Sequence, residues 1–308
     1  MRLRNTYTNL HPGIKLMIVF TLVFIGLFCS QIFSGMVFLL STPSDISPCI
    51  NFTDNLNVNV LKGIQGISAV LTFLIPAYVV ALISHPDPSY HLRMKNMIVI
   101  RDAVFILMLM ISGIPFINLM AEWNTSLNLP ESLDKVEKCI IIMEESAQQI
   151  QEKLLSADNV IGLLINLIVI ALLPALGEEI LFRGIIQRIL RHWTQNIHVA
   201  IIITGFLFSF VHFQFFGFVP RMFLGVLFGY LFYWTGNLWV PILAHFVNNA
   251  IATIWYYMYF RHETTVPDPE EFGTSSESAW LYLSIVMFSS ITIFYFYRRR
   301  KARHVLHK

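Results

Sequence analysis

Three short motifs in the second half of the sequence contain residue types that could hydrolyse a bond. The strings are EEILFR, FSFVH and HFVNN, each set in strongly apolar surroundings. Their polar residues are, in chain order, Glu178, Glu179, Arg183, His212, His245 and Asn249. An ionisable side chain within a membrane is costly, so it needs a partner or a function. Two carboxylates, two imidazoles and an amide can activate a water and hydrogen-bond an oxyanion.

Helical spacing separates the two adjacent glutamates. Glu179 and Arg183 are four residues apart, so they share a helix face and can form an ion pair. Glu178 is rotated by about 100° from Glu179. We therefore expect Glu179 to hold Arg183 and Glu178 to face a cavity.

The same spacing places His245 and Asn249 on one face of their helix, with Asn248 off that face. We expect Glu178, His212, His245 and Asn249 to line one polar cavity. The cavity is expected in the middle or the cytoplasmic half of the bilayer, open to the cytoplasm or sideways to lipid.

The elements that must position these residues are apolar helices. The chain has 308 residues, of which 56% are hydrophobic and 13% are charged, about half the roughly 25% charged residues of soluble domains. A run of about 20 apolar residues spans a bilayer. The pattern predicts an all-α polytopic membrane protein with about eight spans: 16–40, 63–84, 97–120, 160–190, 197–216, 220–234, 238–260 and 279–297.

The basic residues predict the orientation of these spans. Most of them fall in the N-terminal segment, in connections two and four, and in the C-terminal segment, which indicates that both termini are cytoplasmic. Residues 1–308 are read as one membrane domain. Residues 121–158 are read as an external connection that contains an amphipathic helix over 131–155. No basic block lies within a folded segment, so nucleic acid is not expected as a partner.

The three motifs, in this order and on apolar helices, resemble the CPBP family of intramembrane proteases. That family includes the type II CAAX prenyl endopeptidases and bacteriocin-processing or immunity proteins, and its pattern is EExxxR, FxxxH and HxxxN. The resemblance covers about residues 160–260, which would form the catalytic core. The strings EEILFRG and TGNLWVPILAHFVNN look like the bacterial branch.

The resemblance implies hydrolysis of a peptide bond in a membrane peptide or protein substrate. By analogy, Glu178 and His212 would hold and deprotonate the attacking water. His245 and Asn249 would stabilise the oxyanion, while Glu179 and Arg183 would support the helix. The sequence leaves the cofactor open. A divalent metal such as zinc would use Glu178, His212 and His245 if they converge.

Two other functions are compatible with the sequence: a non-catalytic scaffold or bacteriocin-immunity protein of the same family, and a transporter. The transporter interpretation predicts repeat symmetry between the two halves, and the sequence has no such symmetry. The scaffold interpretation predicts degraded motifs, whereas all the polar residues are present. The expected location is the cell membrane, as a multi-pass protein of the bacterial inner membrane.

Overall fold

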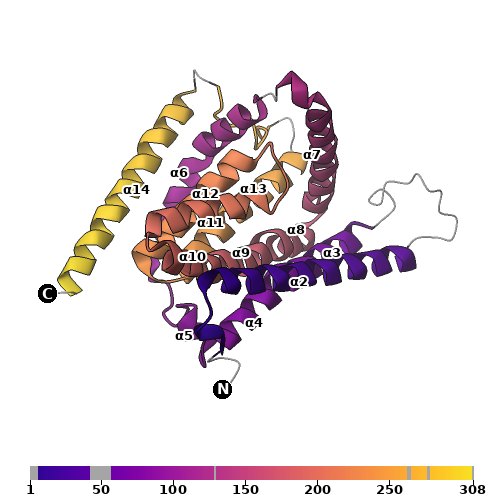
Figure 1. The fold of residues 1–308 in the computed structure, drawn as a ribbon. Helices are drawn as coiled ribbons and strands as arrows, with labels where there is room; N and C mark the ends of the chain where they lie inside the picture. Colours follow the sequence, from indigo (N-terminus) through magenta and orange to yellow (C-terminus); the bar gives the residue numbers. More distant parts are fainter. Residues whose placement is uncertain (1–5, 42–56, 128–129, 262–264, 276–277, 307–308) are drawn as a thin grey trace.

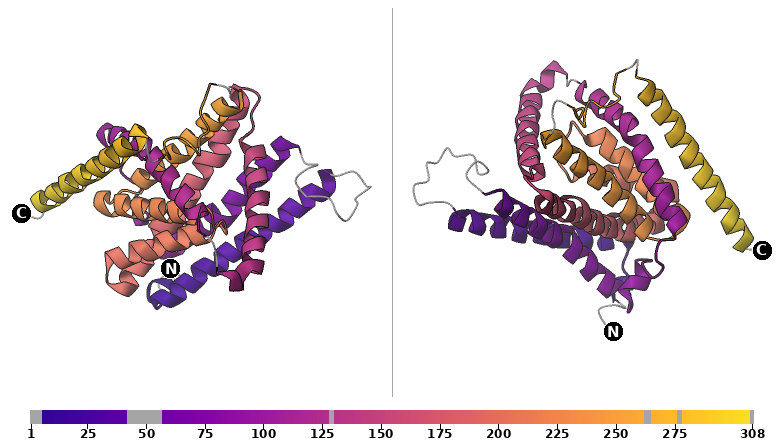
Figure 2. Two further views of the ribbon diagram at one scale, coloured as in Figure 1. Left: turned by 90° about the horizontal axis from the view of Figure 1, so that it is seen from above. Right: turned by 180° about the vertical axis from the view of Figure 1, so that it is seen from behind.

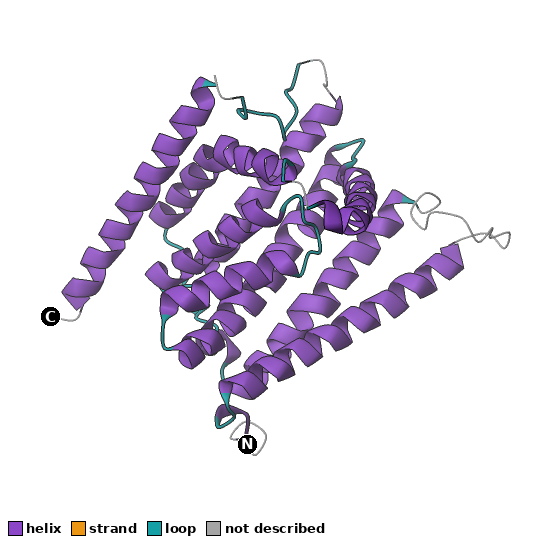
Figure 3. Cartoon of the chain, turned by 45° about the horizontal axis from the view of Figure 1, so that its top comes forward, coloured by secondary structure: helices purple, strands orange, loops and turns teal. Residues whose placement is uncertain are grey.

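The computed structural model describes residues 6–41, 57–127, 130–261, 265–275 and 278–306, and every regular element within them is a helix (Figure 3). Six of these helices are long and apolar enough to cross a membrane. They are Pro12–Ser41, Val58–Ser84, Ile100–Thr125, Val160–Thr194, Phe218–Thr235 and Ala279–Arg299. The chain is therefore an all-α, multi-pass membrane protein, as predicted.

The two remaining predicted spans are also helical. They are α11 (Ile197–Phe210), which is apolar but has only 14 residues, and α13 (Trp239–Arg261). The prediction for α11 was wrong at its end, because the helix stops at Phe210 instead of residue 216. The chain turns there, and Phe213 adopts a positive φ of 51°. His212 consequently lies in the turn after the helix and not on it.

The central helices come from the second half of the chain, and the others pack around them (Figures 1 and 2). The centre is formed by α9 (Leu173–Glu179), η4 (Ile180–Ile186), α10 (Gln187–Thr194), α11, α12 (Phe218–Thr235) and α13. One flank is formed by α2 (Pro12–Ser41), α3 (Val58–Ala69), η1 (Val70–Leu74), α4 (Ile75–Ser84) and α5 (Pro88–His91). The other is formed by α6 (Ile100–Thr125) and α14 (Ala279–Leu306). Two apolar cores hold the flanks, one around Val19 and Phe182, the other around Ile106 and Leu231.

A 22-residue helix, α7 (Asp134–Leu155), follows the short 3-10 turn η2 (Glu131–Leu133). It lies across the end of the bundle, away from the N-terminus (Figure 1). Most of α7 is exposed, but Leu154 packs with Phe38 and Leu61. The sequence predicts that the end of the bundle where α7 lies is external.

The helix at 160–194 contains two π-helical stretches, η3 (Leu167–Leu172), which follows α8 (Val160–Asn166), and η4. Pro174 explains part of this irregularity, because proline has no N–H to donate to the carbonyl four residues earlier. That carbonyl, of Ile170, instead accepts a hydrogen bond from Asn249 Nδ2 at 3.3 Å. Such π stretches are frequent at functional sites.

Two glycines allow α11 and α12 to pack closely. A Cβ atom at Gly225 would lie 3.0 Å from the Cα atom of Gly205, so neither position has room for a side chain. The absence of a side chain at Gly225 also brings the α12 backbone within reach of Arg183, as described below.

Candidate active site

Arg183 and Glu179 form a fully buried ion pair, with 2.7 Å between Nη1 and Oε1. The pairing predicted from their spacing is confirmed. Arg183 Nη2 also donates to the Gly225 carbonyl at 2.9 Å, and its guanidinium lies over the ring of Phe208 at 4.6 Å. A buried charge needs such partners because desolvation is costly. Arg183 therefore links η4 to α12.

Glu179 also bonds His245, which the sequence analysis did not predict. His245 Nδ1 lies 3.0 Å from the same carboxylate oxygen, Oε1, that contacts Arg183. A carboxylate is an acceptor, so Nδ1 must bear the proton and donate it. The imidazole also stacks on Phe228, with 5.4 Å between ring centroids. Glu179 thus fixes both the tautomer and the position of His245.

Glu178 points elsewhere, as its rotation on the helix predicted. Its side chain is 8% exposed, and Oε2 is buried without a hydrogen-bond partner among the described residues. The nearest ionisable contact is His212 Nε2, at 3.9 Å. His212 Nδ1 donates to the Phe208 carbonyl at 2.8 Å, which leaves the Nε2 lone pair toward Glu178. The separation is too long for a direct hydrogen bond.

Glu178, His212, His245 and Asn249 line one cavity of about 490 Å³. Asn248, which is off the helix face that His245 and Asn249 share, also lines this cavity. Its Nδ2 donates to Asn249 Oδ1 at 3.2 Å. That bond, together with the one to the Ile170 carbonyl, fixes the Asn249 amide, whose second N–H has no partner among the described residues. Residues of α7 complete the wall.

Glu178 also lines a second, larger and mainly apolar cavity of about 950 Å³, bounded by α2, α3, α9 and α11. None of the residues lining either cavity comes from connections 85–96, 191–196 or 235–237, which the charge pattern places in the cytoplasm. The expected opening was to the cytoplasm or sideways to lipid, and this lining favours the second. The residues that line the two cavities instead include those of α7 and α2.

Arg221 was missed by the sequence analysis. It lines the 490 Å³ cavity, and its guanidinium is held by the side chain and backbone carbonyl of Gln214. Its Nε is buried without a partner, and no carboxylate lies within 4 Å among the described residues. The signal was available, because Arg221 directly follows Pro220 at the start of a predicted span, where an ionisable side chain needs a partner or a function.

Comparison with known families shows which proteins share the motifs that build this site. Residues 160–251 match the family described as type II CAAX prenyl endopeptidase Rce1-like. The segment 160–251 belongs to the CPBP family. The family is one of CAAX-protease-type peptidases, and the match includes all six motif residues.

A relative of this CPBP segment is the uncharacterized protein YpbD of Bacillus subtilis (strain 168). It is 33% identical over 90 residues, which are 28% of this chain and 43% of that protein. The chain thus matches less than half the length of its relative. No solved structure matches the chain.

The CPBP motifs do not form a metal site as they stand. Across the described ranges, no three His, Cys, Asp or Glu side chains are placed to hold a metal ion. His212 Nε2 and Glu178 Oε2 lie 3.9 Å apart, and His245 Nδ1 is bonded to Glu179. Because the described residues contain no ready cluster of three ligands, the expected set of Glu178, His212 and His245 is not supported.

Proposed function

We propose that this protein is an intramembrane endopeptidase that hydrolyses a peptide bond with a water activated by Glu178. One observation carries the proposal. Glu178 Oε2 has no hydrogen-bond partner among the described residues and lies 3.9 Å from His212 Nε2, in a cavity that His245 and Asn249 also line. Both facing atoms are acceptors. A water that lies about 2.8 Å from each would donate both its protons to them.

The first chemical step is attack of this water on the peptide carbonyl. A bond forms between the water oxygen and the carbonyl carbon, the carbonyl π electrons move to its oxygen, and Glu178 takes one water proton. General-base catalysis of this kind contributes about 10²–10⁴-fold. His212 positions the water for attack, because its own ring is fixed by the hydrogen bond from Nδ1 to the Phe208 carbonyl.

His245 and Asn249 would then stabilise the oxyanion. With Nδ1–H donated to Glu179, the ring can also donate from Nε2 to the oxyanion only as an imidazolium, which is the form that this step requires. Glu178 finally returns its proton to the leaving nitrogen as the carbon–nitrogen bond breaks.

The substrate is proposed to be a membrane peptide or protein that reaches Glu178 through the apolar 950 Å³ cavity beside α2. Arg221 would bind a carbonyl or carboxylate of this substrate, since it has no carboxylate of its own among the described residues. We place the protein in the bacterial cell membrane, with both termini in the cytoplasm.

A library of peptides incubated with the purified chain in detergent, and analysed by mass spectrometry, tests this function. We expect cleavage products with wild type and with Glu145→Ala, whose side chain is exposed on α7, and none with Glu178→Ala. Equal products from wild type and Glu178→Ala would refute the role of Glu178. A wild type without products would favour a non-catalytic role or a transporter.

A further inference from the structure

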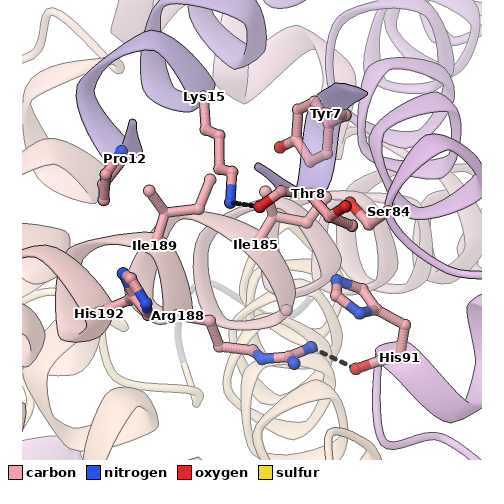
Figure 4. A pocket seen from close by; sticks show the side chains of 11 residues that line it. Tyr7, Thr8, Pro12, Lys15, Ser84, His91, Ile185, Arg188, Ile189 and His192 are labelled. Carbon is pink, nitrogen blue, oxygen red and sulfur yellow. Dashed lines mark hydrogen bonds between the residues drawn. The ribbon is translucent and has the colours of Figure 1, made fainter. Parts of the chain in front are cut away.

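A third cavity, of about 250 Å³, shares no lining residue with the two cavities of the candidate active site. It is lined by side chains from α2, α5 and α10 and from the segment before α2. Figure 4 shows Lys15, His91, Arg188 and His192 arranged around Ile185 and Ile189. No aspartate or glutamate is among the lining residues that the structure describes.

The two cations of this cavity donate to backbone carbonyl oxygens, and Lys15 also lies over the ring of Tyr7, 5.6 Å from its centroid. Lys15 Nζ donates to the Thr8 carbonyl at 2.9 Å, and Arg188 Nη1 donates to the His91 carbonyl (Figure 4). Neither has a carboxylate within 4 Å among the described residues. Asp87, which caps α5, pairs with Lys95 at 2.7 Å instead. The cavity thus has positive charge that no described side chain neutralises.

His91 adds a hydrogen-bonding group and not a third charge. Burial lowers the pKa of His91 to about 4, helped by the charge of Arg188 and by His85. Its ring is therefore neutral at pH 7. The buried Tyr7, also at the wall, adds a hydroxyl.

The position of the cavity matches that of a lipid headgroup. It lies where α2 begins and α10 ends, two ends of membrane-crossing helices. Trp193 is 49% exposed there and contacts His11 edge-on at 5.7 Å, as expected for an aromatic residue at the interface. Pro12, Ile185 and Ile189 supply an apolar wall beside the cations, which free phosphate would not need.

We propose that this cavity binds the phosphate of an anionic phospholipid headgroup. Lys15 and Arg188 contact the phosphate oxygens, and the apolar wall contacts the glycerol and the start of the acyl chains. Basic pockets between membrane helices are suited to such headgroups. The proposal is independent of the peptidase function, although Gly184 and Ile185 of the cavity belong to the same π stretch as Arg183.

The test is titration of the purified full chain in neutral detergent with short-chain phosphatidylglycerol, with binding read by native mass spectrometry and by the thermal midpoint. Phosphatidylcholine of the same chain length and inorganic phosphate are the two comparison ligands. We expect phosphatidylglycerol to bind at least about tenfold more tightly than phosphatidylcholine and to raise the midpoint. Binding of inorganic phosphate at the same strength as phosphatidylglycerol would overturn the lipid assignment.

Variants locate the site. Lys15→Gln and Arg188→Gln should each weaken phosphatidylglycerol binding by at least about tenfold, since each removes a charged hydrogen bond to the phosphate. Arg191→Gln removes the same charge from α10 at an exposed position outside the cavity, and should leave binding unchanged. If Arg188→Gln fails to fold, Lys15→Gln decides. Unchanged binding in Lys15→Gln, or equal loss in Arg191→Gln, would overturn the proposal.

Discussion

Glu179 and His245 are 66 positions apart in the chain, yet the histidine Nδ1 lies 3.0 Å from the same glutamate oxygen that pairs with Arg183. One buried oxygen thus joins α9, η4 and α13. Through Arg183 and the Gly225 carbonyl, the same network reaches α12. Glu179 therefore has two separable tasks, one in stability and one in holding a catalytic imidazole.

Glu179→Gln should lower both yield and activity. Loss of one partner of a buried pair costs roughly 3–5 kcal/mol, and the neutral amide is a weaker acceptor for the Nδ1–H of His245. Adding Arg183→Met should restore the yield but not the cleavage rate. Size-exclusion profiles and initial rates measure the two effects. Full recovery of activity in the double variant would show that Glu179 acts only through Arg183.

Pro174→Ala should raise stability while lowering activity. The new N–H can bond the Ile170 carbonyl, which removes much of the roughly 3 kcal/mol that proline costs within a helix. The same bond competes with Asn249 Nδ2 for that carbonyl, so the amide loses its fixed position. The thermal midpoint and kcat check this. A more stable variant with unchanged kcat would show that this bond does not position Asn249.

Arg221→Gln should raise KM more than it lowers kcat. The guanidinium lines the cavity, and its orientation is set by Gln214, but it is not one of the residues that hold the water. A charged hydrogen bond to the substrate contributes about 1.5–3 kcal/mol. Steady-state kinetics on one cleaved peptide separate the two constants. A kcat loss at unchanged KM would assign Arg221 to the transition state instead.

Reporter fusions test the orientation on which the location of both sites depends. Fusions at Asp134, at the start of α7, and at Pro269 should report the external side, while one at the C-terminus should report the cytoplasm. A cytoplasmic signal at Asp134 would invert the orientation. The 490 Å³ cavity, which α7 covers, would then face the cytoplasm.

Periodicity and charge were sufficient to predict the membrane helices and the Glu179–Arg183 pair, because both depend on local spacing along one helix. The Glu179–His245 bond joins two distant helices, and no spacing rule gives their mutual rotation. The sequence analysis placed His212 within a helix because the apolar run continues past Phe210. In the structure a turn interrupts the helix there.

The position of the cavity depended on features that the sequence shows only indirectly. Residues of α7 complete the wall of the 490 Å³ cavity, and an amphipathic pattern alone does not say where that helix packs. Ideal α-helical geometry places Asn248 off the face of His245 and Asn249, yet adjacent residues can both border a cavity as wide as this one.

The rate of peptide cleavage by Glu178→Gln tests the central claim most directly. The substitution keeps the shape of the side chain and removes the base, so the variant should fold and insert normally. We expect its single-turnover rate to fall by at least about 10²-fold, while Glu145→Gln cleaves at the wild-type rate. A Glu178→Gln rate close to that of wild type, on the same peptide and in the same detergent, would contradict the account.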